Sequence, residues 1–216
     1  MPSSRRERLG RARLYLICDN QPAEFLHAAL DGGVDIVQLR MKDGSDQAII
    51  DAARTFAQIC RERGALMILN DRPDLAAVAD ADGVHIGQDD VPVADARRTV
   101  GADRLIGLST HTPEQVLAAR DLGVDYIGVG PVHETPTKPG RAAVGVELVE
   151  YAIQHVDVPF FAIGGIASGN VEAVRAAGAT RIAVVRALTE ADDPEQAARM
   201  LREALANPIE ASVGSA

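Results

Sequence analysis

Eight short, continuously apolar runs recur along this 216-residue chain, and they constrain its fold more than any other feature. They occupy residues 14–18, 35–39, 65–69, 84–86, 104–108, 126–129, 160–163 and 182–185. Continuous hydrophobicity over such short runs predicts parallel strands that are buried on both faces. Amphipathic helical patterns separate the runs, most clearly over residues 47–63, 113–122, 170–177 and 194–205. The chain is therefore predicted to alternate strands with helices.

The phrases GGVDIVQLR, LGVDYIGVG and AGATRIAVV indicate one repeated module, in which a helix ends, a glycine follows and a buried strand begins. Eight strand–helix units without a linker-like interruption predict a single-domain α/β fold, the (β/α)8 TIM barrel, over residues 14–206. An open doubly wound sheet is the alternative. It is disfavoured because no strand leads into a G-x-G-x-x-G turn.

The two ends of the chain are expected to lie outside the barrel. Residues 1–13, MPSSRRERLGRAR, are predicted to form a flexible basic arm, and residues 207–216 a flexible tail. No apolar run after the arm has the pattern of a signal peptide, and none approaches the ~20 residues that span a bilayer. The two cysteines, Cys18 and Cys60, are too few for a disulfide framework or a thiolate metal site, so the cytoplasm is the expected location.

Charge and aromatic content narrow the classes of partner. The net charge is −9 and aromatic residues make up 3% of the chain, which argues against nucleic acid and anionic membranes as partners. Small molecules remain as the expected partners, and assembly into a homo-oligomer stays open.

In a TIM barrel the active site lies where strands end and the following loops begin, so the strand exits are the places where function is expected. The second predicted strand ends in Gln38-Leu39-Arg40-Met41-Lys42. Alternation along a strand places Gln38, Arg40 and Lys42 on one side and Leu39 and Met41 on the other. Two cations and an amide at the barrel mouth suit a polyanion, although a salt-bridged rim would have the same pattern.

Carboxylates end the next two predicted strands. Asn70-Asp71 follows the third strand, and Asp89-Asp90 follows the fourth. Adjacent strands bring Asp71 and one of the other two aspartates to the same mouth, where hard oxygen ligands suit Mg²⁺. A helix-capping role is the alternative for either residue. Carboxylates beside an arginine and a lysine are what a metal–diphosphate site requires.

Later strand exits supply a second set of anion-binding groups. Ser109 could donate to a phosphate or leaving-group oxygen, and His111 is expected to be structural or to orient substrate. The sixth strand leads into a stiff loop with Thr135, Pro136, Thr137 and Lys138. The last two strands end in Gly164-Gly165 and Val185-Arg186, where barrel enzymes bind phosphate through backbone N–H groups. Two anion sites at one mouth suggest an enzyme that joins a diphosphate-activated substrate to a phosphorylated one.

These motifs, in this order, resemble the thiamine phosphate synthase family from about residue 14 to residue 205. The matching segments are 38–42, Asn70-Asp71, 84–90, Ser109, 135–138 and 163–166. The resemblance implies a transferase that joins 4-amino-5-hydroxymethyl-2-methylpyrimidine diphosphate to a thiazole phosphate or its carboxylated tautomer. It also implies a dissociative mechanism, in which diphosphate leaves before the thiazole nitrogen captures a pyrimidine-methyl cation.

The resemblance also implies roles for individual residues. Asp71 and Asp90 would hold one Mg²⁺ per subunit. The pyrimidine diphosphate would be contacted by Gln38, Leu39, Arg40, Met41, Lys42, Asn70, Ser109 and Lys138, of which Arg40, Ser109 and Lys138 would be catalytic. The thiazole phosphate would be contacted by Thr135, Pro136, Thr137, Gly165, Val185 and Arg186.

The chain departs from the family pattern at Met41, where many members have glutamate, and at Arg186, where many have serine. Three alternatives to the synthase remain. One is the related thiazole tautomerase, an isomerase that needs no diphosphate site. The others are a barrel isomerase of sugar or indole phosphates and a non-catalytic barrel that binds a phosphorylated metabolite. The carboxylate pair beside the cations favours the synthase.

Overall fold

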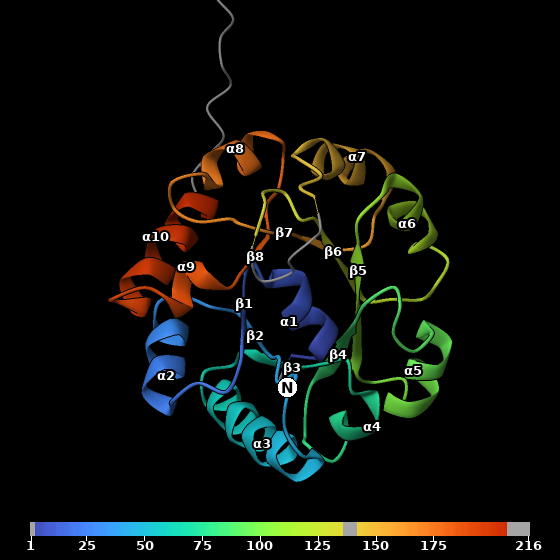
Figure 1. Ribbon diagram of the computed structural model, residues 1–216, viewed down its shortest axis with the longest axis vertical. Coiled ribbons are helices and arrows are strands. Elements are labelled where there is room, and N and C mark those ends of the chain that lie inside the picture. Colours follow the sequence, from blue (N-terminus) through green and yellow to red (C-terminus); the bar gives the residue numbers. More distant parts are fainter. Residues whose placement is uncertain (1–2, 136–141, 207–216) are drawn as a thin grey trace, which may run out of the picture.

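Eight parallel strands form a closed barrel, in the order β1 to β8 with β8 paired to β1, and helices surround it (Figure 1). This computed structural model describes residues 3–135 and 142–206. The strands are β1 Leu14–Cys18, β2 Ile36–Leu39, β3 Leu66–Asn70, β4 Gly83–Ile86, β5 Leu105–Thr110, β6 Tyr126–Val129, β7 Phe160–Ile163 and β8 Ile182–Val184. The predicted (β/α)8 TIM barrel is confirmed.

The helices are α1 Arg5–Arg11, α2 Ala23–Asp31, α3 Asp46–Glu62, α4 Pro73–Ala76, α5 Val93–Val100, α6 Pro113–Ala118, α7 Glu147–His155, α8 Val171–Ala176, α9 Arg186–Thr189 and α10 Pro194–Ala206. Helix α1 precedes β1, each later helix follows a strand, with α9 and α10 both after β8, and all of them lie outside the strands (Figure 1). Within the part of the chain that the structure describes, none of them is long and apolar enough to cross a membrane.

Strand alternation divides the core into two layers. Along β1, Leu14 and Leu16 pack against the helices, whereas Tyr15 and Ile17 point into the barrel. The interior set also includes Tyr126 and other large side chains, all nearly inaccessible to solvent. Because both faces of each strand are covered, the strand sequences are apolar throughout, which is the pattern that predicted them.

The expectation of a flexible arm over residues 1–13 is wrong for α1. This helix lies across one end of the barrel (Figure 1), opposite the strand exits. Its Leu9 is 3% exposed and joins the interior core. The side chain of Ser4 accepts a hydrogen bond from the Glu7 N–H, and the Glu7 carboxylate accepts one from the Ser4 N–H, so two backbone donors at the start of the helix are satisfied.

The arginines of α1 form ion pairs with aspartates that stand just before barrel strands. Arg5 and Arg8 contact Asp82 at 2.9 and 2.8 Å. Arg6 contacts Asp125 at 2.8 Å, and the same carboxylate accepts hydrogen bonds from Arg97 at 2.6 Å and from the backbone N–H of Ile106 at 2.8 Å. The basic segment is therefore part of the folded barrel.

Replacing Asp125 by alanine is expected to lower the free energy of unfolding by about 2–3 kcal/mol. Its side chain is only 8% exposed, and its loss leaves the Ile106 N–H without its acceptor and Arg97 without its ion pair. Urea denaturation measures the change. Asp95→Ala, which breaks the exposed pair with Arg98, is the matched control and should cost under about 1 kcal/mol. Equal losses in the two variants would contradict a structural role for the Asp125 cluster.

Candidate active site

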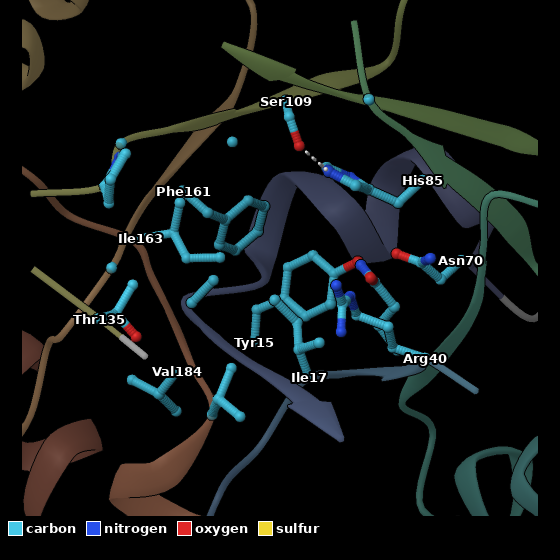
Figure 2. Close-up of a pocket in the computed structure, with 18 of the residues that line it drawn as sticks. Tyr15, Ile17, Arg40, Asn70, His85, Ser109, Thr135, Phe161, Ile163 and Val184 are labelled. Atoms are coloured by element: carbon cyan, nitrogen blue, oxygen red, sulfur yellow. Dashed lines mark hydrogen bonds between the residues drawn. The ribbon is translucent and has the colours of Figure 1, made fainter. Parts of the chain in front are cut away.

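A cavity of about 650 Å³ opens at the carboxyl ends of the strands (Figure 2). Tyr15, Ile17 and Phe161 from the barrel interior form its floor, and the strand exits form its walls. This is the end of the barrel at which the sequence placed the functional groups.

Most of the predicted site residues meet in this cavity. Those that line it are Gln38, Arg40, Lys42, Asn70, Asp71, Asp90, Ser109, Thr135, Gly165, Val185 and Arg186. Leu39 is fully buried in the outer layer of the core, and Met41 packs against the same layer, because alternation along the strand turns both side chains away from the mouth. Neither of these two residues lines the cavity. Pro136, Thr137 and Lys138 lie outside the described residues.

The two carboxylates predicted to bind metal face each other. Burial, together with a hydrogen bond and charge repulsion from Asp90, raises the pKa of Asp71 to about 6, while Asn70 and Arg40 act in the opposite direction. The backbone N–H of Gly87 donates to Asp90 at 2.6 Å, which fixes this carboxylate at the end of β4. Asp71 itself has φ 59° and is tied to β4 by its N–H, which donates to the His85 carbonyl at 2.8 Å.

This donor set fits Mg²⁺. Two carboxylates that repel each other offer hard oxygen ligands, and the charge of a bound divalent cation would offset their repulsion. Among residues 3–135 and 142–206, no group of three or more His, Cys, Asp or Glu side chains is placed to hold a metal. Asp71 and Asp90 are the two residues that would hold the ion, and water and substrate oxygens would complete its coordination, as is usual for Mg²⁺.

The loop after β7 forms the opposite side of the cavity. Gly165 has φ 63°, and a Cβ at this position would lie 2.8 Å from the Cβ of His133 and 3.0 Å from the carbonyl oxygen of Glu134. The amide nitrogen of Asn170 donates to the Gly165 carbonyl at 2.8 Å, and its amide oxygen accepts from the Ala167 N–H at 2.8 Å.

Backbone N–H groups of the loop after β6 donate to the carbonyl oxygens of the two residues before Gly165. The N–H of Val132 donates to Ile163 at 2.8 Å, and that of His133 donates to Gly164 at 3.0 Å. The carbonyl oxygens of residues 163–165, which would repel an anion, are thus occupied by protein donors. Backbone N–H groups at this turn remain the predicted donors to a phosphate.

His111 holds the start of the β6–α7 connection. Its Nδ1 lies 2.5 Å from the carbonyl oxygen of Gly130, and its backbone N–H donates to the side chain of Gln115 at 2.8 Å. The ring also lines the cavity. These contacts agree with the structural or substrate-orienting role expected for this histidine.

Sequence reasoning missed a buried polar group at the floor of the cavity. Tyr15, His85 and Tyr126 all line it, and His85 lies beside Ser109 (Figure 2). Gly107 makes this cluster feasible: a Cβ there would lie 2.1 Å from Tyr126 and 2.5 Å from the His85 ring. The available signal was a histidine at an inward position of one strand with a glycine opposite it on the next.

The fold and the site together define a (β/α)8 barrel whose mouth has a carboxylate–cation side and a glycine-turn side. The family described as thiamine monophosphate synthase matches residues 14–188 of the sequence. The chain therefore belongs to that family.

Relatives share this similarity over nearly the whole chain. The thiamine-phosphate synthase of Streptomyces avermitilis is 51% identical over 205 residues, which cover 92% of this chain and 95% of that protein. That of Thermus thermophilus is 49% identical over 201 residues, which cover 89% and 97%. The Nostoc punctiforme thiamine-phosphate synthase is 50% identical over 198 residues, but this match spans 90% of the chain and only 56% of that longer protein.

A solved structure with a related sequence is also described as a thiamine phosphate enzyme, and a more distant one shares the barrel. A thiamine phosphate pyrophosphorylase from Pyrococcus furiosus superposes with a TM-score of 0.84 at 33% identity, covering 93% of this chain and 97% of that one. A 3-hexulose-6-phosphate synthase superposes with a TM-score of 0.65 at 20% identity, covering 89% and 99%, and supports the barrel fold alone.

Proposed function

We propose that the chain is a thiamine phosphate synthase. It joins 4-amino-5-hydroxymethyl-2-methylpyrimidine diphosphate to a thiazole phosphate and releases diphosphate. The C–O bond between the pyrimidine methylene and the diphosphate breaks, and the electron pair leaves with the diphosphate. The lone pair of the thiazole nitrogen then forms the new C–N bond to that methylene carbon.

One observation supports this proposal: a single cavity has groups suited to binding an anion on each of two sides. Asp71 and Asp90 stand with Arg40 and Lys42 on one side, and the Gly164-Gly165 turn stands on the other. A diphosphate with a divalent cation suits the first side, and a monoester phosphate suits the second. A tautomerase would need only the second.

The residues of the chain would act chiefly by binding charge. Arg40 and Lys42 would attract the diphosphate, and the hydroxyl of Ser109 would donate to it. Mg²⁺, when bound by the two carboxylates, would neutralise charge on the leaving diphosphate. The 4-amino group of the substrate donates electrons to the cation, so no protein nucleophile is needed. The two cysteines are free and buried, which suits the reducing cytoplasm where we place the protein.

Incubation with both phosphorylated substrates and Mg²⁺, followed by chromatographic detection of products, tests the proposal. A synthase yields thiamine phosphate and diphosphate in equal amounts. Interconversion of thiazole tautomers without diphosphate release would indicate the isomerase. Binding of either phosphorylated compound without turnover would indicate a metabolite-binding barrel, and each of these results would refute the synthase.

Replacing Arg186 by serine is expected to raise the KM for the thiazole phosphate by less than about tenfold, or ~1.4 kcal/mol. The Arg186 side chain is 46% exposed and lies 3.8 Å from Glu190, whereas phosphate capture would depend on backbone N–H groups that the substitution retains. Steady-state kinetics with the thiazole phosphate varied measures the effect. A hundredfold rise would show that the guanidinium itself grips the phosphate.

A further inference from the structure

A continuous row of hydrogen-bonding side chains crosses the floor of the cavity. The amide nitrogen of Gln38 donates to the Tyr15 hydroxyl at 2.6 Å. That hydroxyl lies 2.9 Å from the hydroxyl of Tyr126, which lies 3.2 Å from Nδ1 of His85. Nε2 of the same ring lies 3.0 Å from Oγ of Ser109 (Figure 2). The row therefore joins residues of β2, β1, β6, β4 and β5.

Each phenol in this row retains its proton. Tyr15 and Tyr126 are both 1% exposed, and burial raises the pKa of each well above its ordinary value. Each hydroxyl therefore has one hydrogen to donate, and a buried hydroxyl hydrogen without an acceptor is costly. This requirement, together with the amide nitrogen that Gln38 directs at Tyr15, determines the direction of every bond in the row.

The hydrogens can be placed one after another, starting at Gln38. Within residues 3–135 and 142–206, the Tyr15 hydroxyl meets only Gln38 and Tyr126. The amide nitrogen can only donate, so the Tyr15 hydrogen must go to Tyr126. Tyr126 then accepts from Tyr15 and sends its own hydrogen to Nδ1 of His85. With Nδ1 accepting, the neutral ring carries its proton on Nε2, which donates to Ser109.

The reversed direction fails at one point. It would run from Ser109 through His85 and Tyr126 to Tyr15, and Tyr15 would then have to donate to Gln38. The structure has the amide nitrogen of Gln38 at that position, and an amide nitrogen accepts no hydrogen bond.

We propose that this row, Gln38 to Tyr15 to Tyr126 to His85 to Ser109, is a one-way hydrogen-bond chain that makes Ser109 a hydrogen-bond donor to the ligand. Because Ser109 accepts from Nε2 of His85, its own hydrogen is left for an acceptor in the cavity that it lines. An anionic oxygen is the acceptor that such a donor suits. That oxygen belongs to the departing diphosphate, an assignment that rests on the proposed function. Tyr15, Tyr126 and His85 are thus positioning residues.

The tautomer of His85 tests the direction of the hydrogen-bond chain without reference to activity. Long-range 15N–1H correlation spectra of the full-length protein labelled at histidine distinguish protonation on Nε2 from protonation on Nδ1. The His85 signals are assigned by their absence from the His85→Asn spectrum. We expect Nε2 protonated and Nδ1 unprotonated. A ring protonated on Nδ1, alone or together with Nε2, would overturn the proposal, because Tyr126 would then have to accept from it.

A double-mutant cycle tests whether the hydrogen-bond chain acts through Ser109. Tyr126→Phe removes the donor to Nδ1 while keeping the ring, and should lower kcat for thiamine phosphate about tenfold with the thiazole phosphate KM unchanged. In a Ser109→Ala background the same substitution should lower kcat less than twofold. Tyr151→Phe, on a tyrosine that stacks on His155 in α7, is the matched control and should change neither constant.

Equal losses in both backgrounds would show that Tyr126 acts through packing alone, and would overturn the proposal. Failure of the proposed function is a different result. It would leave no thiamine phosphate to measure in any variant. The tautomer of His85 would still decide whether the hydrogen-bond chain has the stated direction.

Discussion

Replacing Asp71 by asparagine is expected to lower kcat for thiamine phosphate formation about a thousandfold, or ~4 kcal/mol. Asp71 faces Asp90 beside Arg40, and losing one of the two carboxylates would weaken metal binding and leave diphosphate charge unneutralised. The fold should survive, because residue 71 has φ 59° and asparagine adopts this left-handed conformation readily. Initial rates at increasing Mg²⁺ concentration, with thermal denaturation alongside, measure both effects.

Asp80 provides a matched control for this substitution. It has the same φ of 59°, but it is exposed and pairs with Arg61 on the surface. Asp80→Asn should therefore leave kcat and its dependence on Mg²⁺ unchanged. Wild-type turnover that persists in excess EDTA would refute the metal-dependent mechanism.

Replacing Gly165 by alanine is expected to raise the KM for the thiazole phosphate at least thirtyfold, or ~2 kcal/mol. The added Cβ would meet His133 and Glu134 at 2.8 and 3.0 Å, in a backbone conformation with φ 63° that favours glycine. The turn would have to shift, and the N–H groups that we propose bind the phosphate would shift with it. Kinetics with each substrate varied in turn separate this effect from any change at the diphosphate side.

Gly169 is the control for the glycine substitution because it lies in the same loop with open space around it. A Cβ at Gly169 would meet nothing within 4 Å, and its φ lies outside the left-handed range. Gly169→Ala should leave both KM values unchanged. If Gly165→Ala also left the thiazole phosphate KM unchanged, phosphate binding at this turn would be refuted.

The fold was predictable because strands buried on both faces have a local signature. The predicted runs 14–18, 126–129 and 160–163 coincide with β1, β6 and β7, and the others differ from the observed strands by one or two residues at one or both ends. Helix α1 was not predictable in the same way. Its stability depends on Asp82 and Asp125, whose ion pairs with the helix join residues 74 to 119 positions apart in the sequence. The sequence of residues 1–13 alone contains none of these partners, so its arginines were expected to be solvated.

The candidate site was also predictable only in part. The proximity of Asp71, Asp90 and Arg40 could be predicted from the sequence, because in a parallel barrel adjacent strands must end at the same mouth. The row through Tyr15, Tyr126 and His85 could not. Its contacts depend on how far side chains reach across the barrel interior and on the space that Gly107 leaves for them, neither of which is fixed by periodicity.

A crystal structure of the protein with thiamine phosphate, diphosphate and Mg²⁺ tests the central claim most directly. We expect diphosphate and metal against Asp71 and Asp90, and the ester phosphate of thiamine phosphate against the backbone N–H groups at Gly165. The newly formed C–N bond should lie between them, within reach of Ser109. Diphosphate bound at the glycine turn, or both anions on one side of the cavity, would contradict the account.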